Sequence, residues 1–412
     1  MKTKSFSNNF YLLLISLVSA MGGLLFGYDW VVIGGAKPFY EIFFAIENSP
    51  GMQGWVMGSA ILGCLIGVTI AGSLSDKYGR KPLMIIAAIT FTVSAIGTGA
   101  VNDLNWFIFY RIFGGIGIGI ASNLSPMYIA EVSPSHVRGK FVSINQLTIV
   151  LGILAAQFVN WLIAEPVVPG ENILETWNGQ MGWRWMFWAE VVPSALFFIL
   201  IFFIPESPRW LATKLQYGKA ENILSHIGGK EYAKKEIESI KTVISATKEK
   251  LNIRMLFQGK IPGILLIGIV IAAFQQWCGL NVVFNYAQEI FAAAGYGVSD
   301  ILFNIVVTGV TNVIFTFVGM YTVDKLGRRS LMLFGASGLA IIYIIMGICY
   351  YLNITGMAVL IMVVLAIACY AMTLAPVTWV VLSEIFPNRI RGMAMAVSTF
   401  SLWVACFVLT YT

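Results

Sequence analysis

A single carboxylate interrupts a long apolar stretch near the N-terminus. Asp29 is the only charged residue from Phe10 to Ala36. An acidic side chain in a membrane-spanning helix costs about 2.5–3.5 kcal/mol, so it should face a cavity or a partner. We expect that partner to be Arg111, a basic residue within another apolar stretch. A carboxylate that is alternately paired and released changes its proton affinity, as coupling of proton movement to a conformational cycle requires. A static pair that holds two helices together is the alternative.

Amide side chains form a second group. Gln146, Gln157 and Asn160 share one narrow stripe of an otherwise apolar helix at 100° per residue. Amides supply hydrogen-bond donors and acceptors without charge. The stripe predicts the lining of a polar cavity at membrane depth, and interhelical hydrogen bonding is the alternative.

Two charged sequence patterns each occur twice, in the same order. DKYGRK (76–81) returns as DKLGRR (324–329), and EVSP-x2-VRG (131–139) returns as EIFP-x2-IRG (384–392). Repetition of this kind indicates a membrane protein built from two parallel repeats, with a substrate site between the halves. The opposite charges predict a gate of ion pairs on one face, closed in one state and separated in the other. The predicted gate residues are Asp76, Arg80, Glu131, Arg138, Asp324, Arg328, Glu384 and Arg391. The alternative is that these charges only set topology, but that role does not require carboxylates.

The composition indicates a polytopic membrane protein. The chain is 58% hydrophobic and 11% charged, against roughly 25% charged in ordinary globular domains. A spanning helix needs about 20 mostly apolar residues. Eleven stretches meet this requirement: 10–33, 54–75, 83–101, 105–130, 141–163, 185–204, 262–288, 302–323, 331–352, 356–383 and 393–412.

These spans predict an all-α fold of two six-helix bundle repeats. Residues 1–206 would form the N-terminal bundle, 207–260 a cytoplasmic helical linker, and 261–412 a C-terminal bundle with five spans. An even number of spans is expected for such a protein, so we expect that the last helix is missing from this chain.

Basic residues set the orientation. All but three of the 26 Lys and Arg residues fall on one side of the predicted spans, the exceptions being Lys37, Arg111 and Arg184. The positive-inside rule makes that side cytoplasmic. We therefore expect a multi-pass protein of the cell (inner) membrane, in contact with the lipid bilayer, with a cytoplasmic N-terminus.

Several function classes are disfavoured. The basic linker has no aromatic–basic interleaving, so we expect no nucleic-acid binding. His136 and His226 lie outside the spans, and the spans contain no metal-ligand or nucleophile constellation. We predict no enzyme activity, no metal and no cofactor, and we expect a monomer.

The motifs together resemble the sugar porter family of the major facilitator superfamily, and bacterial xylose–proton symporters within it. Besides the repeated patterns, the matching segments are GGLLFGYD (22–29), YRIFGG (110–115), PESPRWL (205–211), QQWCGLN (275–281) and PVTW (376–379). The resemblance covers essentially the whole chain. It implies the major facilitator fold and proton-coupled symport of a monosaccharide, with Asp29 and Arg111 at the proton-coupling site.

The resemblance also implies a sugar site. Gln146, Gln275, Gln276 and Asn281 would contact sugar hydroxyls, and Asn312 is a similar candidate. A straight helix would not place Gln275, Gln276 and Asn281 on one face, but Gly279 permits a break that turns all three inward. Aromatic rings stack on the apolar faces of sugars, which adds Trp379, Phe26 and Trp403. For these rings an interfacial belt is the alternative.

The chain departs from the family pattern around this site. Asn285 replaces the first tyrosine of a pair, Leu402 and Cys406 replace amides, and Ala375 replaces a glycine. Hydroxyl recognition depends on such groups, so we expect a pentose or hexose without choosing one. A facilitative uniporter with a structural Asp29, and a sugar sensor with a transporter fold, are the alternatives.

Overall fold

The computed structural model describes residues 2–167, 170–246, 256, 258–259, 261–387 and 391–411, with side chains from residue 10 onward except those of a few residues beside the gaps and of Asp324 and Ser383. The described residues form helices and connecting turns, and eleven of the helical segments are long and apolar enough to span a membrane. The predicted all-α fold and the number of spans are confirmed.

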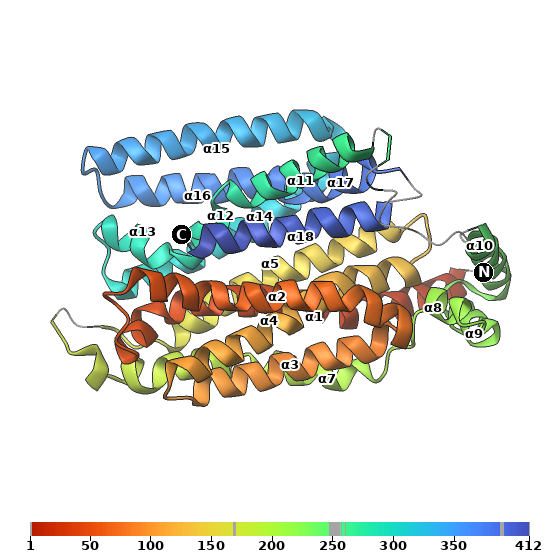
Figure 1. The fold of residues 1–412 in the computed structure, drawn as a ribbon, viewed down its shortest axis with the longest axis horizontal. Coiled ribbons are helices and arrows are strands. Elements are labelled where there is room, and N and C mark those ends of the chain that lie inside the picture. The colour runs from red at the N-terminus through yellow and green to blue at the C-terminus, as the bar shows by residue number, and fades with distance from the viewer. Residues whose placement is uncertain are drawn as a thin grey trace.

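The first half of the chain forms one bundle (Figure 1). Its main helices are α1 (Lys2–Phe43), α2 (Pro50–Tyr78), α3 (Arg80–Ala100), α4 (Leu104–Val132), α5 (Arg138–Ile163), α6 (Trp183–Trp188) and α7 (Val191–Ile201). Short turns η1 (Ile173–Glu175) and η2 (Asn178–Gly182) precede α6.

Glycines allow the closest contact in this bundle. A Cβ on Gly63 of α2 would lie 2.0 Å from the carbonyl oxygen of Ile112, and one on Gly115 of α4 would lie 2.0 Å from that of Ala60. Gly67 and Gly119 repeat the arrangement one turn further along. Small residues at this spacing let two helix backbones touch, which is how helices associate in lipid without a hydrophobic driving force.

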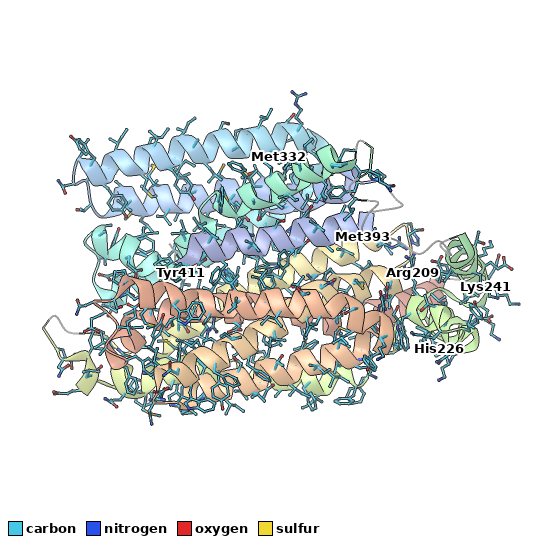
Figure 2. The ribbon with its side chains drawn as sticks, in the orientation of Figure 1. Arg209, His226, Lys241, Met332, Met393 and Tyr411 are labelled. Carbon is cyan, nitrogen blue, oxygen red and sulfur yellow. The ribbon has the colours of Figure 1, made fainter. Side chains whose placement is uncertain are left out.

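Three amphipathic helices connect the halves: α8 (Pro208–Thr213), α9 (Tyr217–Gly228) and α10 (Lys230–Ala246). They lie together at one end of the molecule, where Figure 2 labels Arg209, His226 and Lys241. Leu211, Leu224 and Ile237 pack into a small core of their own. We call this end of the bundle the linker end and the opposite end the far end.

The second half contains the remaining helices. They are α11 (Ile261–Trp277), α12 (Leu280–Asn285), α13 (Ala287–Ala293), α14 (Val298–Leu326), α15 (Arg328–Tyr351), α16 (Met357–Met372), α17 (Leu374–Ile385) and α18 (Arg391–Tyr411). The halves meet where α5 packs on α14, α2 packs on α18, and α1 contacts α12 and α13.

Two predicted span boundaries are wrong. The first span runs from Phe10 to Phe43, ten residues beyond the predicted end at 33, and the sixth begins at Asn178, before the predicted start at 185. The apolar stretch stops near Lys37 and Glu41, but both charged side chains are buried, at 0% and 7% exposure. Because they are paired inside the protein, the helix continues past the place where hydropathy alone predicts an end.

Candidate functional site

The predicted pair of Asp29 and Arg111 is present in the interior of the first half. Asp29 lies on α1 and Arg111 on α4, and their side chains are 2% exposed each. Arg111 Nη1 donates to Asp29 Oδ1, and Arg111 Nη2 donates to the Asp29 carbonyl oxygen at 3.3 Å. Asp29 Oδ2 has no hydrogen-bond partner among the described residues. Arg111 therefore holds one carboxylate oxygen of Asp29, and the other makes no hydrogen bond to a described residue.

Glu190 is a second acid at this pair, and sequence reasoning missed it. It lies between α6 and α7, is 2% exposed, and is close enough to interact electrostatically with Asp29 and Arg111. Its Oε1 also lacks a hydrogen-bond partner within the described part of the chain. Its position inside predicted span six was a signal that could have found it, because intramembrane acids are functional candidates by default. Two buried carboxylates thus lie near one guanidinium, and the printed ion pair is the one between Arg111 and Asp29.

The predicted helix break occurs at Gly279. Helix α11 ends at Trp277, Gly279 has φ 86°, and α12 begins at Leu280. A positive φ favours glycine, which explains why the chain can turn there. The break brings Gln275, Gln276 and Asn281 into one hydrogen-bonded group, although a straight helix would separate them.

These three amides form a chain of hydrogen bonds. Gln275 Nε2 donates to the Tyr370 hydroxyl of α16, Gln276 Nε2 donates to Gln275 Oε1 at 2.8 Å, and Asn281 Nδ2 donates to Gln276 Oε1. Asn281 Nδ2 also approaches Cys406 Sγ of α18 at 3.6 Å. A thiol is a weaker acceptor than the amide that the family pattern has there, so Asn281 keeps hydrogen-bonding capacity for a ligand.

An aromatic cluster joins the halves beside this group. Phe26 and Trp30 of α1 lie 5.8 and 5.7 Å from Trp403 of α18, measured between ring centroids. Phe26 and Trp403 were predicted, whereas Trp30 was not. Trp30 follows Phe26 by one helical turn, and that spacing was the available signal. Trp403 lies one turn from Cys406, which places the aromatic cluster next to Asn281.

The three remaining predicted sugar contacts lie outside the hydrogen-bonded chain of amides. Gln146 is half-buried, Asn312 is 5% exposed and Trp379 is 38% exposed. No contact found among the described residues joins these three to the amide chain.

Gln157, on the same stripe as Gln146, is 1% exposed, and a Cβ on Gly309 of α14 would lie 1.9 Å from its Oε1. Gln157 therefore faces α14 of the other half. Asn160, the third member of the stripe, instead donates to the Val32 carbonyl oxygen of α1 at 2.9 Å, which is the interhelical hydrogen bond considered as the alternative.

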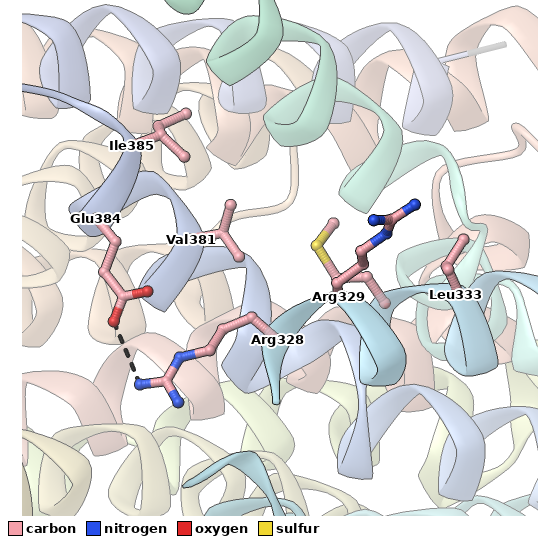
Figure 3. A pocket seen from close by; sticks show the side chains of 7 residues that line it. Arg328, Arg329, Leu333, Val381, Glu384 and Ile385 are labelled. Atoms are coloured by element: carbon pink, nitrogen blue, oxygen red, sulfur yellow. Dashed lines mark hydrogen bonds and ion pairs between the residues drawn. The ribbon is translucent and has the colours of Figure 1, made fainter. Parts of the chain in front are cut away.

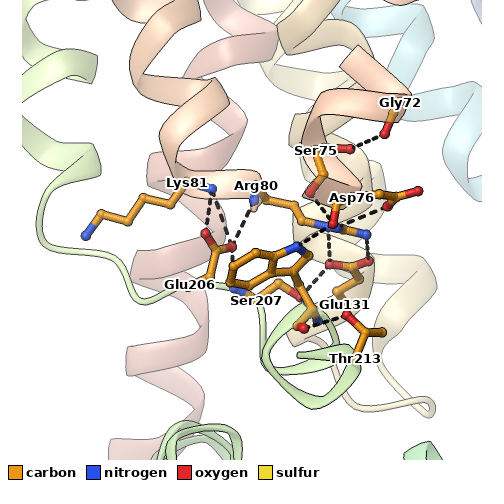
Figure 4. Close-up of polar contacts among 10 residues, drawn as sticks. Gly72, Ser75, Asp76, Arg80, Lys81, Glu131, Glu206, Ser207 and Thr213 are labelled. Carbon is orange, nitrogen blue, oxygen red and sulfur yellow. Dashed lines mark hydrogen bonds and ion pairs between the residues drawn. The ribbon is translucent and has the colours of Figure 1, made fainter. Parts of the chain in front are cut away.

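Charged residues of the first repeated pattern form a compact cluster at the linker end (Figure 4). Arg80 donates two hydrogen bonds to Glu131, from Nε at 3.0 Å and from Nη2 at 2.9 Å. Asp76 Oδ1 lies 3.3 Å from Arg80 Nη1, and Arg138 Nη2 lies 3.5 Å from the Ser133 carbonyl oxygen. All of these residues belong to the first half.

The second repeated pattern forms the matching pair in the second half. Arg328 Nη2 lies 3.2 Å from Glu384 Oε1 beside a pocket lined by Val381 and Leu333 (Figure 3). The side chains of Asp324 and Arg391 lie outside the described residues. The ion pairs described at this end join helices of the same half.

Glu206 holds the linker-end cluster together, and the predicted gate did not include it. It follows α7, and its carboxylate accepts hydrogen bonds from the backbone N–H of Arg80 at 3.0 Å and of Ser207 at 2.7 Å. A Cβ on Gly79 would lie 2.3 Å from Glu206 Oε2, so only glycine leaves room for this contact. Burial raises the pKa of Glu206, and the backbone N–H donors oppose that rise.

The raised pKa predicts a pH dependence of stability. The folded state binds the Glu206 proton more tightly than the unfolded chain, so stability should fall as pH rises from the ordinary value of 4.5 through the raised one. Glu206→Gln should remove this component. Thermal unfolding of the purified protein from about pH 4 to about pH 7 measures it. Glu238→Gln, an exposed carboxyl on α10, is the control, and an unaltered slope in Glu206→Gln would contradict the prediction.

Arg111 is not the only basic side chain that is buried within a span. Lys37 lies within the first span and Arg184 within the sixth, and both are buried. Arg184 donates to the carbonyl oxygens of Gly99 at 2.8 Å and Val101 at 2.7 Å, so it ties α6 to the end of α3. Lys37 pairs with carboxylates at the far end.

A two-halved helical bundle with a buried ion pair, a broken helix and amides beside the junction is the architecture of a secondary transporter. The chain belongs to the family described as sugar (and other) transporters, whose profile matches residues 15–412. This confirms the predicted family.

Named relatives cover nearly the whole chain. A D-xylose-proton symporter of Escherichia coli (strain K12) is 38% identical over 429 residues, covering 98% of this chain and 86% of the relative. An arabinose-proton symporter of Bacillus subtilis (strain 168) is 37% identical, covering 98% and 85%. The fold matches the xylose transporter XylE from E. coli in a partially occluded inward-open conformation, with TM-score 0.85, 34% identity, and coverage of 97% of this chain and 92% of that chain.

Proposed function

We propose that this protein is a proton-coupled monosaccharide symporter that works by alternating access. The observation that carries the proposal is the buried cluster of Asp29, Arg111 and Glu190 next to an uncharged, amide-bearing site at the junction of the halves. We further propose that the linker end and the N-terminus face the cytoplasm of a cell membrane, in keeping with the basic linker, and that one chain is one transport unit.

Charge balance suggests how the proton is carried. One guanidinium can neutralise only one of two carboxylates, and a surplus charge in a buried site is costly. A proton bound to Asp29 or Glu190 removes that surplus. We propose that protonation of Asp29 loosens its contact with Arg111, and that release of the proton restores it. Because Asp29 binds α4 while Phe26 and Trp30 contact α18, α1 links the proton site to the junction of the halves.

The chemistry of the second site suggests a neutral, polyhydroxylated substrate. Gln275, Gln276 and Asn281 offer donors and acceptors, Trp403 and Phe26 offer apolar faces, and none of them carries a charge. Hydroxyl groups would replace bonds that the amides now make to one another. We propose a pentose or hexose, in keeping with the xylose, arabinose and glucose named for relatives of 37–38% identity.

The linker-end charges fit a cytoplasmic gate. Their described ion pairs stay within each half, as expected when that end is open. We propose that in the opposite state the two clusters approach and close the end, with Arg80 and Glu131 facing Arg328 and Glu384.

A facilitative uniporter is the second candidate. It is supported by a glucose facilitated diffusion protein of Zymomonas mobilis that is 32% identical over 412 residues. In that case the pair of Asp29 and Arg111 would be static.

Sugar addition to de-energised membrane vesicles distinguishes the two. A symporter should make the lightly buffered medium more alkaline as xylose, arabinose or glucose enters, and a protonophore should abolish the signal. Entry of labelled sugar without alkalinisation would establish the uniporter instead. Entry of none of the three sugars would contradict the proposed substrate class.

A further inference from the structure

A buried lysine lies at the far end, away from both sites described above. Lys37 of α1 has no exposed surface. Its Nζ donates to Glu289 Oε1 of α13, lies 3.6 Å from Glu41 Oε1 one turn further along α1, and lies 4.1 Å from the centre of the Tyr286 ring. Neither the proton site nor the sugar site uses these groups.

The cluster joins the two halves of the protein. Lys37 and Glu41 belong to the first half, and Tyr286 and Glu289 belong to the second. The Tyr286 hydroxyl donates to the carbonyl oxygen of Thr410 on α18 at 2.7 Å, so this side of the contact is fixed to a long helix of the second half. The ion pair of Lys37 and Glu289 therefore has to break whenever the halves separate at the far end.

The carboxylates of Glu41 and Glu289 have different roles at Lys37. A buried ammonium is strongly destabilising unless it is paired and hydrogen-bonded. Glu41 lies on the same helix, so it stays near Lys37 in every state. Glu289 and the Tyr286 ring are lost when α13 moves away from α1, and water then replaces them. Their interaction with Lys37 thus differs between the closed and open states, which is the condition for shifting a conformational equilibrium.

We propose that Lys37 and Glu289 form a reversible latch that stabilises the state closed at the far end and so sets how often the transporter opens there. Tyr286 adds to the latch through its ring, and Glu41 holds Lys37 in place when the latch is open. The inference rests on the proposed function in one respect, namely that the far end faces outward.

A cysteine at Leu302 can report opening of this junction. Leu302 of α14 is 3% exposed and packs among far-end residues of the first half, including Val32 and Ala36 of α1. Leu302→Cys is smaller than the native side chain, so it should fit. The native chain without this cysteine gives the background, since its five cysteines are buried or half-buried.

The experiment measures the rate at which a membrane-impermeant maleimide labels Leu302→Cys in intact cells. Glu289→Gln should raise that rate about fivefold, because the open state becomes more populated. Glu47→Gln is the matched control: it removes the same charge from an exposed far-end position without a described contact between the halves, and it should leave the rate unchanged. Glu289→Asp, which keeps the charge at a shorter reach, should give an intermediate rate.

Each result decides a separate point. An unchanged rate in Glu289→Gln, or an equal rise in Glu47→Gln, would overturn the latch. If Glu289→Gln does not reach the membrane, the Asp variant decides, since an unchanged rate there also overturns it. Labelling of Leu302→Cys only in inside-out vesicles would overturn the proposed orientation, while a Glu289→Gln effect in those vesicles would still support the latch.

Discussion

Asp29→Asn should reduce sugar accumulation to a ratio of about one across the membrane, because a carrier without a proton site can only equilibrate its substrate. The asparagine oxygen can still accept a hydrogen bond from Arg111, so the helices should stay together. Exchange of labelled for unlabelled sugar, which needs no net proton movement, should survive. Uptake into energised vesicles and equilibrium exchange in the same preparation measure the two quantities.

Asp300→Asn is the control for this prediction. It makes the same chemical change at an exposed position in the first turn of α14. Accumulation should be unaffected in this variant. Undiminished accumulation in Asp29→Asn would show that the pair with Arg111 is structural and that Asp29 does not couple proton movement to sugar transport.

Gln276→Ala should weaken sugar binding by about 1–3 kcal/mol, which is about 5- to 150-fold in the dissociation constant. Gln276 is the central member of the amide chain, since it donates to Gln275 and accepts from Asn281. Its removal would take away one contact with the sugar at the proposed site and would leave two neighbours incompletely bonded. Titration calorimetry on the purified protein measures the change.

Gln216→Ala serves as the control for the amide, because Gln216 is an exposed residue before α9. It should bind sugar like the native protein. Equal affinity in Gln276→Ala and the native protein would remove Gln276 from the site.

The fold was predictable because each membrane-spanning helix needs a long apolar stretch, and such stretches are visible in the sequence. The eleven spans and the family follow from apolar stretches and paired motifs, and the structure and comparisons confirm them. The break at Gly279 was also predictable, since a glycine between polar residues of one span suits a helix interruption. Its consequence, a hydrogen-bonded chain from Tyr370 to Asn281, required the position of α16.

The missed residues share one property, which is that their partners are distant in sequence. Lys37 and Glu289 are 252 positions apart. A hydropathy pattern predicts that the first span ends before Lys37, because a charged side chain inside a membrane is unfavourable. The pattern does not show the distant carboxylate that pairs with this lysine. Glu190 was overlooked for the same reason, as its neighbours Asp29 and Arg111 come from other helices. The gate residues were predicted by type, but only the structure gives the pairing of Arg80 with Glu131.

Helix α1 is continuous from Lys2 to Phe43, and it carries Phe26, Asp29 and Lys37 within about three turns. Pro38 donates no backbone hydrogen bond, but it follows Lys37, so all three residues precede it in one helix. A tilt of α1 would therefore move the proposed aromatic sugar contact, the proposed proton acceptor and the far-end lysine together. A movement of α1 that starts at one of these residues would therefore shift the other two directly, with no other residues needed to transmit it. By thermodynamic reciprocity, if a bound sugar changes the affinity for the proton by some factor, a bound proton changes the affinity for the sugar by the same factor.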